Sequence, residues 1–291
     1  MSSSLFGPRL FVGVDAGGSK TLARVANHAG ETLGLARGGP ANANTDPCAA
    51  WKTILETCAQ AIAEAGLGPE ALGTMHAGLG IAGLDHLNPQ LPAEWGDPPF
   101  KRWRVEGDAV VAQLGAFAGQ DGAVLIVGTG TVGLSVMQGR RVVIGGYGSN
   151  VSDEGSGAWI GREAVRRALW ALDGRRGHTG LVAALENHIG SLANVAAWSR
   201  IASPANYAQL VPAVLELEKQ GDAAARHILA DAAAHIADVA RGLVRSGATK
   251  LAITGGLGSY FGPRLDDVGI EIVEPLGDAL DGAIALARMA Q

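Results

Sequence analysis

Two glycine-bearing segments constrain this chain most, because each follows a short apolar run and leads into a second run that alternates like a β-strand. The first spans residues 14–21 (VDAGGSKT) and the second spans residues 128–133 (GTGTVG). Glycine allows the main chain to approach a ligand closely, and successive N–H groups in such turns can cradle phosphate oxygens. The pair therefore predicts two anion-binding hairpins in a mixed α/β protein.

The first segment has an alternative interpretation as a P-loop. Gly13 and Gly18 have the P-loop separation, but Ser19 occupies the position of the required lysine. The run Thr21–Ala26 then alternates like a strand, whereas a P-loop opens a helix. We therefore reject the P-loop and retain a plain hairpin turn as the structural alternative. Asp15, at a strand end beside two glycines, favours a phosphate loop, since its carboxylate could hold a metal ion.

The second segment, taken alone, matches the G-x-G-x-x-G fingerprint of dinucleotide-binding loops. That fingerprint requires a helix directly after the loop, so that the helix N-terminus meets the pyrophosphate. Here residues 134–137 (LSVM) alternate like a strand and end at a Gln138-Gly139 turn. A glycine–threonine hairpin is therefore favoured, and a dinucleotide-dependent oxidoreductase is kept as an alternative function.

A third glycine segment follows the apolar run 251–254 and contains Gly255, Gly256 and Gly258. Its glycines would allow a nucleotide base or ribose to lie flat on the main chain. A simple strand-to-helix turn explains this segment equally well. Three such segments together, two of them in matching places of the two halves, indicate a clamp for the γ-phosphate between two domains.

Hydrophobic periodicity predicts the same topology twice along the chain. The first half has the order β-β-β-α-β-α-β-α, and the second half opens again with three strands. The predicted strands are 10–14, 20–26, 31–37, 75–82, 102–105, 123–127, 132–138, 141–144, 251–254 and 270–273, and the predicted helices include 47–65, 109–118, 158–172 and 278–289. We expect domains at 1–119 and 120–291 with a ligand cleft between them, a helical insert at about 177–247, and a final helix 278–291 that packs back on the first domain.

Composition excludes several classes of function. The chain of 291 residues is 47% hydrophobic, has a formal net charge of −5, and contains no Lys/Arg run that would predict a nucleic-acid groove. No apolar stretch reaches the ~20 residues of a membrane span, and no signal peptide is recognised. Cys48 and Cys58 are expected to be reduced thiols of a cytoplasmic protein. The seven histidines lack the spacing of a zinc site. Small polar ligands are therefore the expected partners, and a homodimer is the default assembly.

Acidic and amide side chains follow the predicted strands at places suited to sugar chemistry. Asp108 lies between a short strand and a helix, where it could accept the proton of an attacking sugar hydroxyl, although helix capping is a common alternative role. Residues 145–159 (GGYGSNVSDEGSGAW) combine glycines, hydroxyls and two adjacent carboxylates. Asn42 and Asn44 follow the third strand and could add amide contacts, or could simply form a turn.

These motifs resemble those of the BadF/BadG/BcrA/BcrD ATPase-like family, within the sugar kinase, Hsp70 and actin superfamily. The resemblance covers essentially the whole chain and is greatest to the family's glucosamine and N-acetylglucosamine kinases. It rests on Asp15–Thr21, Gly128–Thr131, Thr254–Gly258, the long signature Gly145–Gly161, and the insert pieces 195–199 and Pro204–Pro212. It implies an α/β fold of two actin-like (ribonuclease H-like) domains with an interdomain cleft and a helical insert in the second.

The resemblance also implies roles for individual residues. Asp108 would be the catalytic base for phosphorylation of a sugar 6-hydroxyl, and Asp15 would help to place Mg²⁺. The ATP-binding set would be Gly17, Gly18, Ser19, Lys20, Thr129, Gly130, Thr131, Ala208, Gly255 and Gly256. The amino-sugar set would be Asn42, Asp108, Gly146, Tyr147 and Asp153.

Three departures from the family pattern are visible. Ala16 replaces a usual glycine, Thr131 replaces a usual serine, and Tyr147 replaces a usual tryptophan beside the sugar. The last change leaves glucosamine and N-acetylglucosamine both open as acceptors. A non-catalytic protein that senses sugar or ATP is a second alternative. An activator ATPase of a radical dehydratase is discounted, because Cys48 and Cys58 are too few and poorly placed for an iron–sulfur cluster.

Overall fold

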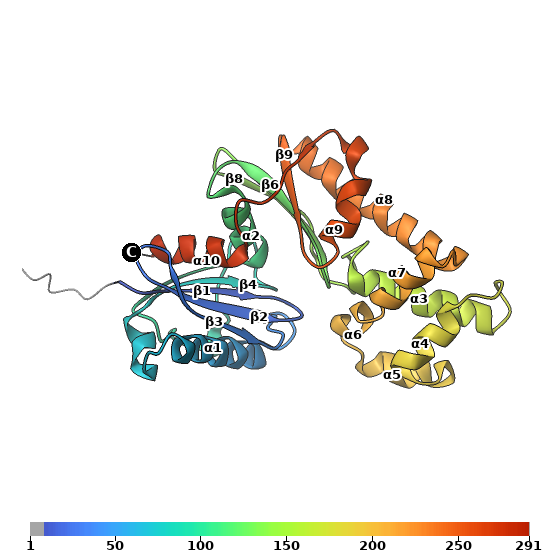
Figure 1. The fold of residues 1–291 in the computed structure, drawn as a ribbon, viewed down its shortest axis with the longest axis horizontal. Coiled ribbons are helices and arrows are strands. Elements are labelled where there is room, and N and C mark those ends of the chain that lie inside the picture. The colour runs from blue at the N-terminus through green and yellow to red at the C-terminus, as the bar shows by residue number, and fades with distance from the viewer. Residues whose placement is uncertain (1–8, 291) are drawn as a thin grey trace, which may run out of the picture. The chain divides into compact units, whose positions relative to one another are not determined.

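The computed structural model describes residues 9–290, which form two five-stranded sheets with the same strand order (Figure 1). The first sheet has the order β3-β2-β1-β4-β5, and the second has the order β10-β9-β6-β7-β8, which is the same order read from the other edge. The strands are β1 Phe11–Ala16, β2 Thr21–Ala26, β3 Thr32–Gly38, β4 His76–Ile81, β5 Arg102–Gly107, β6 Gly122–Val127, β7 Thr131–Met137, β8 Arg140–Gly145, β9 Lys250–Thr254 and β10 Glu271–Ile272. The repeated topology predicted from periodicity is confirmed.

The register of the first sheet determines which residues meet at its edge. β1 is antiparallel to β2 and parallel to β4, and β4 is parallel to β5. Asp15 lies opposite Gly80, and Gly80 lies opposite Glu106. The carboxyl ends of β1, β4 and β5 therefore share one edge, which is where open α/β sheets bind ligands.

The chain divides into two compact units. The first comprises residues 1–124, 134–143 and 273–291, and the second comprises residues 125–133 and 144–272. The strands β6, β7 and β8 cross this division, so the units do not separate at a single point in the sequence. The expected boundary at residues 119 and 120 stays a prediction, and each unit is described by itself.

In the first unit, α1 (Pro47–Glu64) and α10 (Ala279–Arg288) cover opposite faces of the sheet (Figure 1). Val12 and Val14 face α1 and pack with Ile54 and Cys58, whereas Phe11 packs with Ile284 on the other face. This alternation follows the two-residue period of a strand that is buried on both sides. The segment farthest along the chain thus completes the core of the first unit.

Some of the glycines serve close packing of helices rather than ligand binding. A Cβ built on Gly78 in β4 would lie 2.0 Å from the carbonyl oxygen of Ala283 in α10, so any side chain would push the helix off the sheet. Sequence analysis associated the glycine clusters with strand ends and phosphate loops. The structure shows that some of the chain's 43 glycines instead lie in strand interiors where helices approach closely.

One predicted helix is absent from the described residues. The sequence order placed a helix between the strands at 75–82 and 102–105, but this connection contains only the single 3-10 turn η2 (Ala93–Trp95). Trp95 packs against Trp51 of α1 and donates its ring N–H to the carbonyl of Pro47. Trp95 therefore anchors the segment to α1, and the described connection forms no longer helix than this turn.

The second unit is rich in helices between the strands β8 and β9. The helices are α3 Gly157–Leu172, α4 Leu181–Ile189, α5 Val195–Ile201, α6 Pro204–Ala208, α7 Val211–Lys219 and α8 Ala223–Arg245, with the short α9 Gly258–Phe261 after β9. The long α8 begins at the capping residue Asp222, whose carboxylate accepts from the Ala225 N–H at 2.9 Å. None of the described helices is long and apolar enough to span a bilayer.

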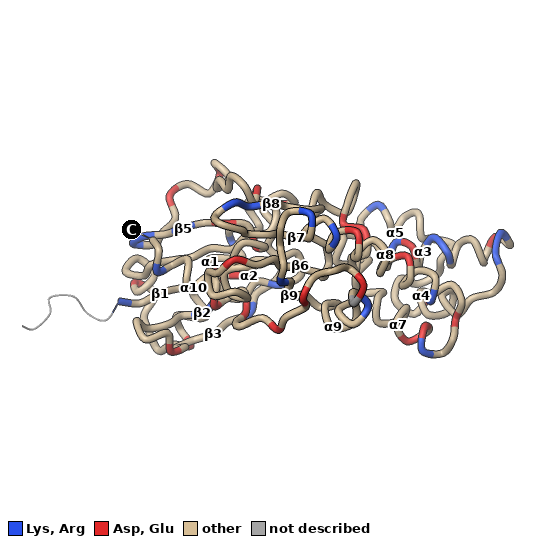
Figure 2. Tube along the Cα trace, turned by 90° about the horizontal axis from the view of Figure 1, so that it is seen from above, with Lys and Arg blue, Asp and Glu red and all other residues tan. Residues whose placement is uncertain are grey.

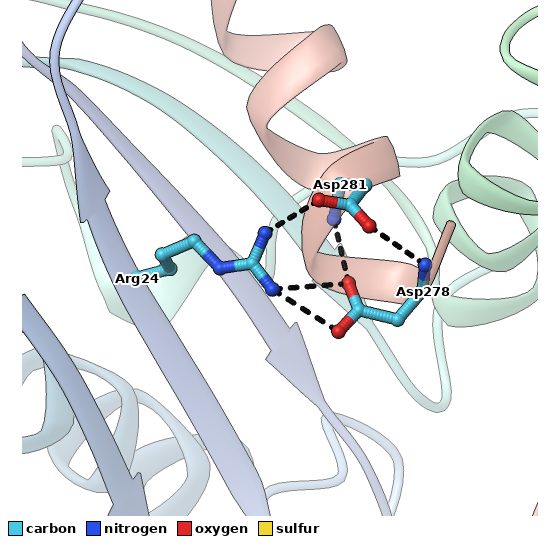
Figure 3. A network of polar contacts seen from close by, with 3 residues as sticks. All are labelled: Arg24, Asp278 and Asp281. Carbon is cyan, nitrogen blue, oxygen red and sulfur yellow. Dashed lines mark hydrogen bonds and ion pairs between the residues drawn. The ribbon is translucent and has the colours of Figure 1, made fainter. Parts of the chain in front are cut away.

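A charged network joins the start of α10 to β2 (Figure 3). Arg24 donates to Asp278 at 3.1 Å and to Asp281 at 2.5 Å, and these two aspartates also form the capping box of α10. Lys and Arg are interspersed with Asp and Glu along the described chain (Figure 2). The network holds the last helix in register with the hairpin that carries the first glycine loop.

Candidate functional site

The shared carboxyl edge of β1, β4 and β5 gathers the predicted site residues of the first unit. Asp15 is the penultimate residue of β1, and Asp108 directly follows β5. Asn42 forms an isolated bridge with Ala82, which directly follows β4. Neighbouring strands lie about 5 Å apart, and β4 lies between β1 and β5. Asp15 and Asp108 are therefore separated by roughly 10 Å across the sheet. The structure thus brings three predicted residues to one edge.

The first glycine loop is a tight turn between β1 and β2. The Gly17 N–H donates to the Lys20 carbonyl at 2.9 Å, and the Gly17 carbonyl accepts from the Ala41 N–H at 2.9 Å. Gly18 has no described neighbour within 4 Å of where a Cβ would lie, while Ser19 and Lys20 are exposed. A strand follows the loop, which confirms the rejection of the P-loop. The turn presents its main chain to solvent, as an anion-binding loop requires.

The electrostatics of this edge centre on Asp15. Burial raises the pKa of Asp15 to about 7, Asp108 and Asp278 add to the rise, and Lys20 opposes it. The carboxylate is therefore held where its negative charge is poorly solvated. Carboxylates with a raised pKa are typical of functional sites. A bound cation would stabilise the charged form of Asp15, which burial disfavours.

Asp15 is compatible with a role in holding a magnesium ion. Among residues 9–290, no group of three or more His, Cys, Asp and Glu side chains is arranged to hold a metal. Magnesium in phosphoryl-transfer sites usually keeps several waters and takes only one or two carboxylates, the rest of its ligands coming from the phosphates. A single buried carboxylate beside a phosphate-type loop fits that donor set.

Asp108 is the first residue of α2 (Asp108–Phe117), and Gly107 is the residue that precedes and caps the helix. The Oδ1 atom of Asp108 accepts from the Ala109 N–H at 2.9 Å and lies 3.8 Å from Nε2 of His86. Sequence analysis placed the helix start one residue later and weighed a capping role for Asp108. The structure gives the capping position to Gly107, with no side-chain cap bond.

A polar pocket lies beside Asn42 on the loop that follows β4. It has a volume of about 350 Å³, within the range of small-ligand pockets. Its polar lining comes from Asn44, Asp85, Asn88 and Gln90, and its apolar lining from Leu84, Leu91 and Pro92. Oδ1 of Asp85 accepts from the N–H groups of Leu87 and Asn88 at 2.8 and 3.3 Å, which fixes the orientation of the carboxylate.

The second glycine loop joins β6 to β7 and is bonded to the start of α3. Inside the loop, the Gly128 N–H donates to the Gly130 carbonyl at 2.9 Å. The carbonyls of Gly128 and Thr129 accept from the N–H groups of Gly157 and Ala158 at 2.8 and 3.1 Å. Because β7 follows the loop directly, the Rossmann interpretation is wrong and the hairpin interpretation is confirmed.

Asp153 lies beneath this loop rather than on the surface. Its residue is 8% exposed, and its main chain has a φ of 61°, an unfavourable region for a residue other than glycine. Burial raises the pKa of Asp153, while hydrogen bonds from the main chain of Thr131 and Gly148 oppose the rise. A Cβ on Gly130 would lie 2.8 Å from Oδ2 of Asp153. The carboxylate thus connects the second glycine loop to the Gly145–Gly148 turn.

The remaining predicted residues of the second unit come from α6, from the turns after β8 and β9, and from the start of β7. A Cβ on Gly157 would lie 3.0 Å from the Ala208 Cβ, so α6 reaches the loop. The positive-φ Gly255 approaches the Val127 carbonyl, which accepts from the Leu257 N–H at 2.9 Å. Gly256 beside it is exposed.

The turn after β8 carries two more of the predicted residues. Tyr147 is 78% exposed, and Gly146 has a φ of 77° and packs against Val132. Thr131 is buried, and its Oγ1 has no hydrogen-bond partner among the described residues.

The structure therefore divides the predicted site into two sets. Asp15, Gly17–Lys20, Asn42 and Asp108 belong to the first unit. The set Thr129–Thr131, Gly146, Tyr147, Asp153, Ala208, Gly255 and Gly256 belongs to the second unit. Sequence analysis missed Asp85, His86 and Asp278. No motif marks them, and only the approach of separate segments in the fold gives them their positions.

Several known proteins are similar to this chain in sequence. The model of the BadF/BadG/BcrA/BcrD ATPase family matches residues 12–260. The glucosamine kinase GspK of Vibrio cholerae serotype O1 is 33% identical over 279 residues, which is 95% of each chain. The N-acetyl-D-glucosamine kinase of Dictyostelium discoideum is 26% identical over 261 residues, covering 81% of this chain and 79% of its own.

Solved structures extend the comparison to the fold. A Chromobacterium violaceum protein with the provisional name N-acetylglucosamine kinase aligns with a TM-score of 0.86 and 32% identity, covering 96% of this chain and 99% of its own. A ROK family glucokinase from Streptomyces griseus, solved with glucose and AMPPNP, aligns with a TM-score of 0.55 at 19% identity over 97% and 99% of the two chains. The second likeness shows the fold alone, which is the actin-like sugar-kinase fold.

Proposed function

Because this chain belongs to the BadF/BadG/BcrA/BcrD ATPase family and is a sugar kinase, we propose that it phosphorylates the 6-hydroxyl of an amino sugar with ATP. The observation that carries the proposal is the placement of Asp108 at the carboxyl edge of the first sheet. There it follows β5 and shares the edge with the poorly solvated carboxylate of Asp15, with Asn42 and with the polar pocket.

The mechanism assigns separate tasks to the glycine loops and to Asp108. Main-chain N–H groups of the loops Gly17–Lys20 and Thr129–Thr131 bind the phosphates of ATP. A magnesium ion held by Asp15 would neutralise charge on the transferred phosphoryl group. Asp108 orients the acceptor hydroxyl and takes its proton as the phosphoryl group leaves ADP. Little else is required, because phosphoryl transfer depends mainly on positioning and electrostatic stabilisation.

The rival functions have less support in the fold. A dinucleotide-dependent oxidoreductase needs a helix after its glycine loop, and strands follow both the first and the second glycine loop. An iron–sulfur activator needs cysteines that can converge on a cluster. Cys48 is exposed and Cys58 is buried on the same helix, α1. A protein that binds ATP or sugar without turnover shares every binding feature and is separated only by an activity assay.

The polar pocket favours glucosamine over N-acetylglucosamine as the acceptor. The charged residue among its lining groups is Asp85, and the other polar groups are amides. A carboxylate attracts the ammonium of glucosamine, whereas an acetamido group would be better matched by an apolar recess. We therefore assign the pocket to the C2 side of the sugar, with Asp85 as the partner of the ammonium.

Coupled ADP release in the presence of MgATP tests the proposed activity directly. The acceptor panel is glucosamine, N-acetylglucosamine, N-acetylmannosamine and glucose. We expect sugar-dependent ADP release with glucosamine as the best acceptor. Release that no sugar accelerates, together with retained ATP or sugar binding by calorimetry, would establish the non-catalytic alternative instead.

The variant Asp85→Asn tests the assignment of the pocket. The amide keeps an oxygen for the Leu87 and Asn88 N–H groups but loses the charge, so the loop should stay in place. We expect kcat/KM for glucosamine to fall about tenfold, which corresponds to about 1.4 kcal/mol, while kcat/KM for glucose stays within twofold. The glucosamine-to-glucose ratio cancels any general loss of folding or catalysis. An unchanged ratio would remove Asp85 from acceptor recognition.

A further inference from the structure

His86 lies against the carboxylate proposed as the general base. Its Nε2 is 3.8 Å from Oδ1 of Asp108, and its side chain is 13% exposed. The residue comes from the loop after β4, whereas Asp108 comes from the start of α2. No sequence motif joins them, so this contact depends on the parallel pairing of β4 and β5.

The other ring nitrogen of His86 indicates where the proton resides. Nδ1 is buried and has no hydrogen-bond partner in the part of the chain that the structure describes. A buried N–H without an acceptor is rare in proteins, because the donor loses its hydrogen bonds to water. The neutral ring therefore carries its proton on Nε2, the atom that faces Asp108.

Burial of His86 favours the neutral form of its ring. Burial lowers the pKa of His86, the Arg141 guanidinium lowers it further, and the carboxylates of Asp85 and Glu106 oppose the change. A neutral imidazole with its proton on Nε2 can donate to Asp108 but cannot accept a proton at that atom. The geometry therefore fits a donor to the carboxylate and excludes a proton relay through Nε2.

Two features of the fold hold the ring in place. A Cβ on Gly107 would lie 1.9 Å from Nδ1 of His86, so only glycine lets the ring pack beneath the start of α2. The carbonyl of His86 accepts from Arg141 Nη1 at 3.2 Å. Arg141 in turn forms a two-pronged ion pair with Glu106 at 2.7 and 2.9 Å. The backbone and the ring of His86 are thus each fixed by residues next to Asp108.

We propose that His86 is a positioning residue for Asp108, and that its Nε2–H donates to Oδ1 when substrate binds. Oδ1 already accepts from the Ala109 N–H, so a second donor on that oxygen fixes the carboxylate plane and directs the other oxygen to the acceptor hydroxyl. Catalytic hydrogen bonds are often long before substrate binds and shorten in the complex. This proposal rests on the proposed function, since it requires Asp108 to be the base.

A pair of variants at one position separates positioning from packing. His86→Leu keeps an apolar side chain without a donor, whereas His86→Gln places an amide N–H close to the position of Nε2. We expect His86→Leu to lower kcat by about 10- to 100-fold, as the loss of an orienting partner does elsewhere, with KM for sugar and ATP within about threefold. We expect His86→Gln to recover at least a third of the wild-type kcat.

The controls make each outcome decisive. Gly107→Ala should also lower kcat, because its φ of −64° and ψ of 154° suit alanine, while the three atoms nearest to the added methyl group all belong to the His86 ring. His227→Leu, at an exposed site on α8, should have no effect. Equal losses in His86→Leu and His86→Gln that follow the melting temperature would overturn the proposal, and so would wild-type kcat in His86→Leu. In either case an active wild type and an inactive Asp108→Asn variant would leave the proposed function intact.

Discussion

Replacing Asp108 by Asn is expected to lower kcat by about two to four orders of magnitude while the protein stays folded. A positioned general base typically contributes that much to a proton transfer, and an amide cannot take the proton. The fold should tolerate the change, because the amide oxygen can still accept from the Ala109 N–H that Oδ1 accepts at 2.9 Å. KM for ATP should change little, since the carboxylate is assigned to the acceptor rather than to the nucleotide.

The measurement is kcat from coupled ADP release at saturating sugar and MgATP, together with a melting curve. Asp231→Asn is the matched control, because Asp231 is a carboxylate of α8 that pairs only with Arg167 in the described contacts. If Asp108 served the helix alone, its loss would lower the melting temperature and leave kcat per folded molecule unchanged. A near-wild-type kcat in Asp108→Asn would remove Asp108 as the base.

The sequence predicted the framework of this site because the framework depends on local patterns. Alternation after residues 17–20 and after residues 128–130 correctly gave strands, and this was enough to exclude the P-loop and the Rossmann loop. Asp108 was singled out as a candidate because it stands between a strand and a helix, a placement that the structure has. The three-strand opening of each half followed from counting strands and turns along the sequence, and the structure has it in both halves. Resemblance to the family supplied the remaining roles.

The contacts that distinguish the site could not be predicted in the same way. His86 reaches Asp108 only because β4 and β5 pair in parallel, so that residues some twenty positions apart end at the same edge. Asp278 affects Asp15 across nearly the whole chain, through the packing of α10 on β1. Asp153 resembles an exposed loop residue in sequence, yet its carboxylate is buried beneath the second glycine loop. Periodicity carries no information on such distant contacts.

Glycines serve two purposes in this chain, and sequence analysis recognised only one of them. Glycines at the turns do shape the two loops, as predicted. Gly78 has a different origin, because it lies in the middle of β4 where α10 meets the sheet. Composition alone cannot separate the two uses, since both require the absence of a side chain near another main chain.

Asp15→Asn is expected to abolish most of the activity and, unusually, to make the protein more stable at pH 8. Folding raises the pKa of Asp15 from its ordinary value of 3.8 to about 7, chiefly through burial. Between those values the native state holds a proton that the unfolded chain has released. The contribution of Asp15 to the free energy of unfolding therefore falls as the pH rises from about 4 to 7, and it stays low above pH 7.

The neutral amide of Asn does not titrate, so the variant escapes this loss. The full shift corresponds to about 4 kcal/mol at most, and partial exposure of Asp15 will reduce the gain. We expect the melting temperature of Asp15→Asn to exceed that of the wild type by several degrees at pH 8 and by less at pH 5. The exposed Asp97→Asn variant should show neither the gain nor its pH dependence.

Magnesium and ATP should reverse the order of stability, and this reversal is the sharpest part of the prediction. A ligand that binds only the native state stabilises it according to its affinity, so MgATP should raise the wild-type melting temperature by more than that of Asp15→Asn. Together the two results would show that the carboxylate of Asp15 lowers the stability of the ligand-free protein and contributes to the binding of MgATP. An Asp15→Asn variant that is less stable than the wild type by the same margin at pH 5 and pH 8 would contradict the placement of a strained, metal-binding carboxylate at this edge.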